Sequence, residues 1–125
     1  MRLRIRWVAL ATMTLTALGA AEAGAIGSPE RAARAAASCA VPDYPGSGYF
    51  TSLTVRRVSC RTGRRLALAY YRCRTKNGPA GRCKRARVLR YRCHEVRTSI
   101  ETEINGRVTC KRGRKRVIHT YQQNL

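Results

Sequence analysis

Six cysteines in a chain of 125 residues constrain the fold more than any other feature of this sequence. In a short exported chain, so many cysteines usually form disulfides. None of them stands in a Cys-x-x-Cys pair, which argues against a zinc site and against a thioredoxin-type redox pair. We therefore predict structural disulfides, no metal and no cofactor. The cysteines are Cys39, Cys60, Cys73, Cys83, Cys93 and Cys110.

The N-terminal segment 1–23 has the pattern of a secretory signal peptide. Three arginines precede an apolar run over residues 7–18, which is shorter than the ~20 residues a membrane-spanning helix needs. Small residues then offer cleavage after Ala23 or after Ala25. The sequence thus predicts a secreted, extracytoplasmic protein with no transmembrane segment once the signal is removed.

The cysteine spacing suggests one disulfide but leaves the others open. Cys73 and Cys83 flank a turn-forming Asn77-Gly78-Pro79 string, so they are the first pairing we expect. The remaining four cysteines allow three pairing schemes, and spacing does not choose among them.

The rest of the chain divides into a low-complexity, flexible segment over residues 24–48 and one disulfide-bonded domain over residues 49–125. At the start of the domain, residues 50–58 are rich in β-branched side chains and predict a strand. Residues 59–73 follow with apolar side chains at helical spacing, and Ser59 is the candidate N-cap. Gly63 on the apolar side of this helix predicts close packing against a sheet.

Beyond a basic loop over residues 74–87, the alternating pattern returns. Residues 88–96 predict a strand, Asn105-Gly106 predicts a hairpin turn, and Gly113 predicts a second turn before a last strand over 116–121. The order strand, helix, strand, strand, strand predicts an α+β fold. We expect a small antiparallel sheet of about four strands with one helix packed on one face.

These motifs resemble a loosely defined group of small secreted, cysteine-containing bacterial proteins of unknown function. The resemblance rests on Val58-x-Cys60-x-x-Gly63 opening an apolar helix, a Tyr91-x-Cys93 strand, and Val108-x-Cys110-x-x-Gly113 before a final strand. The resemblance covers about residues 49–121. Cys73 and Cys83 look like an addition to the pattern of the group. It implies a small exported α+β domain and offers no catalytic residues.

The charge is strongly positive: 26 Lys and Arg residues against 6 Asp and Glu residues give a net charge of +20. Such a balance excludes an acidic disordered segment and favours polyanionic partners such as envelope polymers, lipid head groups or, without sequence specificity, nucleic acid. We expect a monomeric, non-enzymatic protein. The candidate polyanion-binding residues are Arg56, Arg61, Arg64, Arg65, Arg72, Arg90, Arg92, Arg107, Lys111, Arg112, Arg114 and Lys115. Of these, Arg56, Arg90, Arg92, Arg107 and Lys111 are expected on the sheet face away from the helix.

Two other classes of function stay open. A secreted basic ribonuclease would need a general base, a general acid and a phosphate-binding cation, and Glu95, His119 and Arg107 are the candidates on adjacent predicted strands. The sequence contains no His-Glu-x-x-His, Gly-x-Ser-x-Gly or phosphate-loop motif.

A secreted inhibitor or other protein-binding module is the second alternative. It would present an exposed apolar patch centred on an aromatic side chain. Tyr44, Tyr49 and Phe50 beside the Pro/Gly-rich loop are the candidates.

Overall fold

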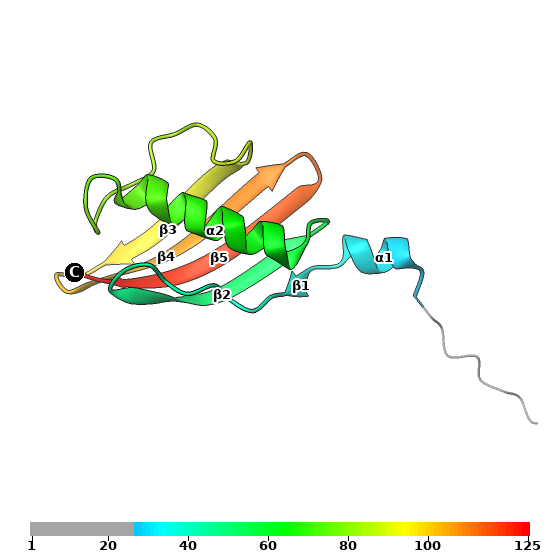
Figure 1. Cartoon of the computed structure of the whole chain (residues 1–125), viewed down its shortest axis with the longest axis horizontal. Coiled ribbons are helices and arrows are strands. Elements are labelled where there is room, and N and C mark those ends of the chain that lie inside the picture. Colours follow the sequence, from blue (N-terminus) through cyan, green and yellow to red (C-terminus); the bar gives the residue numbers. More distant parts are fainter. Residues whose placement is uncertain (1–26) are drawn as a thin grey trace, which may run out of the picture.

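A computed structural model describes residues 27–125, except the side chains of residues 32–33. It shows an α+β fold in which one main helix lies across one face of an antiparallel sheet (Figure 1), as the sequence predicted. The predicted signal peptide and its two cleavage positions lie outside the described residues. The elements are α1 (Pro29–Arg34), β1 (Ala37–Ser38), β2 (Gly48–Arg56), α2 (Cys60–Thr75), β3 (Arg92–Ser99), β4 (Glu103–Arg112) and β5 (Lys115–Asn124).

The five strands are arranged in the order β1-β2-β5-β4-β3, and every neighbouring pair is antiparallel. The fifth strand beyond the predicted four is β1, a two-residue edge strand that pairs with the end of β2. The hairpin of β4 and β5 turns at Gly113, where φ is +56°, as the turn signal predicted. Residues that alternate along each strand therefore face either α2 or the opposite, uncovered side.

The main helix forms where the apolar spacing predicted it. The Ser59 side chain accepts a hydrogen bond from the Thr62 backbone N–H at 3.1 Å, which satisfies one of the free donors of the first turn. Gly63 faces the sheet, and a Cβ atom there would meet Val55 Cγ1 at 2.6 Å. The missing side chain therefore lets the helix backbone approach β2 closely, which confirms the predicted role of this glycine.

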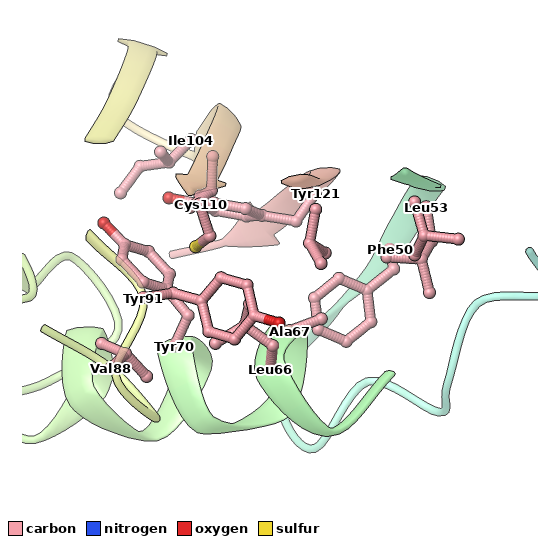
Figure 2. Close-up of a cluster of buried hydrophobic side chains, with 13 residues drawn as sticks. Phe50, Leu53, Leu66, Ala67, Tyr70, Val88, Tyr91, Ile104, Cys110 and Tyr121 are labelled. Carbon is pink, nitrogen blue, oxygen red and sulfur yellow. The ribbon is translucent and has the colours of Figure 1, made fainter. Parts of the chain in front are cut away.

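The core lies between α2 and the covered face of the sheet (Figure 2). Leu66 and Ala67 on the helix are fully buried, as are Val108 and Val117 on the central strands. Burying a leucine or valine side chain contributes about 1.5–3 kcal/mol relative to leaving it exposed. Because no element within residues 27–125 covers the other face, this apolar burial occurs on one side of the sheet.

The three disulfides are Cys39–Cys60, Cys73–Cys83 and Cys93–Cys110. The predicted Cys73–Cys83 pair is confirmed, and the structure selects one of the three schemes that spacing had left open for the others. Cys93 and Cys110 are direct cross-strand partners on β3 and β4. Each bridge of this kind is worth about 2–4 kcal/mol of stability.

The predicted domain start at residue 49 is too late. Ala37 pairs with Val55, the Cys39–Cys60 bridge ties the chain to the start of α2, and Tyr44 contacts the core. Residues 37–48 thus belong to the folded domain, because a short edge strand and a disulfide anchor a segment whose composition reads as loop. Within residues 27–125, no helix combines the length and apolar character needed to cross a membrane.

The predicted strand over 88–96 is wrong in its first half. Val88 and Tyr91 exchange both backbone hydrogen bonds, and the residues between them, Leu89 and Arg90, adopt φ values of +46° and +69°. These are the features of a tight turn that asparagine and glycine usually form. Leu89 is consequently exposed instead of facing the core with Tyr91, and β3 begins only at Arg92.

The predicted hairpin turn at Asn105-Gly106 is also wrong. Both residues lie within β4, opposite Gln122 and Tyr121 of β5, and the turn falls at residues 100–102 instead. A Cβ atom on Gly106 would collide with the ring of Tyr121. Gly106 is present because the Tyr121 ring crosses β4 at this point, and not because the chain turns.

Replacing Gly106 by alanine should therefore displace Tyr121 and lower the free energy of unfolding by about 1–3 kcal/mol, the usual range for overpacking. Denaturant unfolding of the oxidised protein measures this change. The control is Asn105→Ala at the neighbouring exposed position, which should change stability by less than ~1 kcal/mol. Equal losses for the two variants would contradict the role assigned to Gly106.

Candidate cationic surface

The uncovered face of the sheet carries a straight row of four cations, one from each long strand. Arg56 of β2 pairs in register with Arg116 of β5, Arg116 pairs with Lys111 of β4, and Lys111 pairs with Arg92 of β3. All four side chains are exposed. Neighbouring strands lie about 4.8 Å apart, so the row spans about 14 Å. We call Arg56, Arg116, Lys111 and Arg92 the cationic row.

The cationic row is electrostatically unfavourable by itself. Like charges directly opposite each other on neighbouring strands destabilise a sheet. Among the ion pairs within residues 27–125, none involves a member of the row. An anion laid across the strands would relieve this repulsion, because one extended anionic molecule would reach all four cations.

A hollow of about 250 Å³ lies at the end of the sheet beside the cationic row. Its walls include Arg57 and, from the β4–β5 hairpin, Gly113, Arg114 and Lys115, together with three members of the row. The positive charge therefore gathers at one end of the uncovered face.

Beyond the cationic row, this face carries Arg107, the aliphatic side chains of Val96 and Ile118, and several polar groups. Thr120 hydrogen-bonds with Thr51 and with Ser52, the second at 2.6 Å. At the end opposite the cationic row, Glu103 accepts hydrogen bonds from Gln122 at 2.8 Å and from Asn105 at 3.0 Å. Among the strand residues of the described chain, Glu103 is the carboxylate on this face, and it stands at the opposite end of the strands from the cationic row.

Four of the five cations predicted for the uncovered face occupy it: Arg56, Arg92, Arg107 and Lys111. Arg90 does not, because it belongs to the turn before β3. Arg116 was missed, although a two-residue turn at Gly113 and strand alternation place it opposite Lys111. The predicted cations elsewhere lie on the helix and at the hairpin end; these are Arg61, Arg64, Arg65 and Arg72, and Arg112, Arg114 and Lys115.

On the covered face, β3 contributes a buried ion pair. Arg97 Nη2 lies 2.6 Å from Glu95 Oε2, and both side chains are about 5% exposed or less. Tyr121 donates a hydrogen bond to the other Glu95 oxygen. Arg97 also donates to the carbonyls of Ala80 and Gly81 at 3.1 and 2.7 Å. This ion pair joins the sheet to the loop after α2. The sequence pattern did not predict this contact.

A second buried arginine lies beside this pair. Arg74 is 1% exposed, and its guanidinium donates to Pro79 O at 2.6 Å, to Tyr44 Oη at 2.8 Å and to Gln123 Oε1 at 3.1 Å. It also stands 4.4 Å from the centre of the Tyr121 ring, within cation–π range. Burial raises the pKa of Tyr44 to about 12, although Arg74 opposes the shift. Burial therefore favours the neutral phenol of Tyr44, against the effect of the neighbouring guanidinium.

His119 is, with Arg74 and Gln123, one of the buried polar residues in the described part of the chain. Its ring packs edge-on against Phe50 and Tyr70, and within residues 27–125 its buried Nδ1 atom has no hydrogen-bond partner. Burial lowers the pKa of His119 to about 4, and the Arg74 charge adds to this shift. The imidazole is therefore neutral near pH 7.

The structure does not bring the candidate nuclease residues together. Glu95 and His119 face the core from β3 and β5, which are separated by β4, and each pairs with Val108 in register. That register places them about two strand spacings, or ~9.6 Å, apart. Arg107 lies on the uncovered face instead. No group of three or more His, Cys, Asp or Glu side chains within the described part of the chain is arranged to hold a metal ion.

The aromatic residues considered for a protein-binding patch do not form an exposed group. Phe50 is buried, Tyr44 is partly buried against Phe50 and Tyr71, and only Tyr49 is half exposed. The Tyr49 hydroxyl donates to Gln122 Oε1 at 2.6 Å. These contacts show that two of the three rings serve the core.

Comparison with protein-family models, with curated proteins and with solved structures finds no match.

Proposed function

We propose that this protein is an exported, non-enzymatic domain that binds anionic polymers of an envelope or of the extracellular space. The observation that carries the proposal is the cationic row, four like charges in one register line on an uncovered sheet face. Like charges directly opposite each other on neighbouring strands repel, and an anion lying across them would relieve this repulsion. The three disulfides support export, because bridges of this kind persist in oxidising compartments.

The row suits a repeating anion better than a single small one. Its cations stand at regular strand spacing of about 4.8 Å, so a polymer crossing the strands meets one after another. The hydroxyl and amide side chains farther along the face supply donors and acceptors of no net charge. Phosphate polymers, acidic polysaccharides and nucleic acid all offer such a series of charges, and each would lose affinity as salt rises.

The test compares two variants that lose the same number of positive charges, one from the cationic row and one from other parts of the surface. Binding of the oxidised protein to heparin, DNA and teichoic acid is titrated across a salt series. The row variant is Arg56→Gln, Arg92→Gln, Lys111→Gln and Arg116→Gln. The matched control removes four cations elsewhere: Arg61→Gln, Arg64→Gln, Arg65→Gln and Arg90→Gln.

The row variant should lose at least tenfold in affinity at ~0.15 M salt, and its salt slope on DNA should fall by about 3–4, near 0.9 for each contact. The control should lose much less. Equal losses in the two variants would show that the charge acts generally and would overturn the role of the cationic row. Disappearance of all binding by the unaltered protein at ~0.15 M salt would overturn the proposal as a whole.

A further inference from the structure

A second and larger hollow, of about 590 Å³, lies between the C-terminal half of α2 and the loop that follows it. Its walls come only from the helix and this loop, so it is on the side of the sheet that α2 covers (Figure 1). No residue of the cationic row lines it. The two cationic regions are therefore separate parts of the surface.

Five exposed cations surround this hollow: Arg72, Lys76, Arg82, Lys84 and Arg85. Within residues 27–125, only Arg82 of these five cations forms an ion pair. Its partner is Glu95, and the closest atoms are 3.8 Å apart. The Cys73–Cys83 bridge fastens the middle of the loop to the helix. This bond keeps the three loop cations beside Arg72 of the helix and Lys76, the residue that follows it, against their mutual repulsion.

Apolar groups form part of the wall between the cations. Ala69, Val88 and Cys73 contribute them, and Asn77 adds a polar side chain. Leu89 is 49% exposed at the edge of the hollow, and its φ of +46° is one that leucine rarely adopts. The turn thus presents a large aliphatic side chain to solvent beside a cluster of cations. A soluble polyanion gains nothing from such a wall, whereas an alkyl chain does.

We infer that this hollow binds a phosphate-bearing amphiphile, with the phosphate among the five cations and the alkyl chain against Val88 and Leu89. Arginine and lysine are suited to this arrangement, because their apolar stems extend the wall while their charged ends reach the anion. The site uses none of the residues of the cationic row, so it stands whether or not the row binds a polymer.

The test compares two soluble probes that share the phosphate and differ in the alkyl chains. Dihexanoyl phosphatidic acid, kept below its micelle concentration, should bind the oxidised protein at least tenfold more tightly than glycerol 3-phosphate. Leu89→Asn should reduce this ratio to below threefold, because asparagine accepts the left-handed backbone but removes the aliphatic contact. The double variant Lys84→Gln, Arg85→Gln should weaken binding of both probes.

The row variant described above is the matched control, and it should leave the ratio unchanged. Equal affinity for the two probes in the unaltered protein would show that only the phosphate is recognised and would overturn the inference. An unchanged ratio in Leu89→Asn would overturn it as well. Loss of heparin binding in the row variant is a separate outcome, so failure of the polymer proposal and failure of this one are distinguishable.

Discussion

Replacing Glu95 by glutamine is expected to lower the free energy of unfolding by about 3 kcal/mol or more. The substitution removes the negative charge but preserves the shape of the side chain. Arg97 would then remain buried without its partner, since its other contacts are the neutral carbonyls of Ala80 and Gly81. The hydrogen bond from Tyr121 would also weaken, because its acceptor is no longer charged.

Denaturant unfolding of the oxidised protein gives the measurement. Glu101→Gln is the matched control, since this carboxylate is exposed in the turn between β3 and β4 and should change stability by less than ~0.5 kcal/mol. Adding Arg97→Met to Glu95→Gln should recover part of the loss, because no unpaired charge then remains buried. A loss below ~1 kcal/mol for Glu95→Gln would mean that water reaches Arg97 and that the pair is not closed.

Acid is expected to destabilise the protein through His119. Its pKa is about 4 in the folded state and 6.5 ordinarily, so the unfolded chain binds the proton more readily. The stability that this difference provides is fully present above pH 6.5 and is lost as the pH falls toward 4. At 1.36 kcal/mol for each pKa unit, the loss across this interval is about 3 kcal/mol.

The measurement is the free energy of unfolding from pH 7 to pH 4, for the unaltered protein and for two single variants. His119→Leu should flatten the profile over this interval, since leucine also suits the contacts with Phe50 and Tyr70. His94→Leu, at an exposed position on the uncovered face, should leave the slope as it is. A slope that persists in His119→Leu would assign the acid sensitivity to other groups.

Local signals in the sequence were sufficient for the helix and for one disulfide. Ser59 and Gly63 act where their chemistry predicted, because capping and close approach are decided by neighbouring atoms. The hairpin turn predicted at Asn105-Gly106 was wrong for the opposite reason. The glycine is required by Tyr121, which is near in space but distant along the chain. The turn at Leu89 and Arg90 carries no turn-forming residue, so no local signal marked it.

Strand alternation in the sequence predicted which cations lie on the uncovered face, but it did not predict how they are aligned. Arg56, Arg92 and Lys111 were placed on the uncovered face, but their alignment in one line depends on the register between strands. Only the register between β4 and β5 could be predicted from the sequence, because the turn at Gly113 fixes it. The hollow beside α2 could not be predicted, because it depends on where the Cys73–Cys83 bridge, with a sequence separation of 10, holds the loop after the helix.

The three disulfides join the first cysteine to the second, the third to the fourth and the fifth to the sixth. Of the 15 ways to pair six cysteines, only one has this property. In the export proposed above, a chain that crosses the membrane from its N-terminus would expose its thiols in that same order. An oxidase that couples each newly arrived thiol to the one before it would therefore make the native set directly, and the protein would mature without a disulfide isomerase.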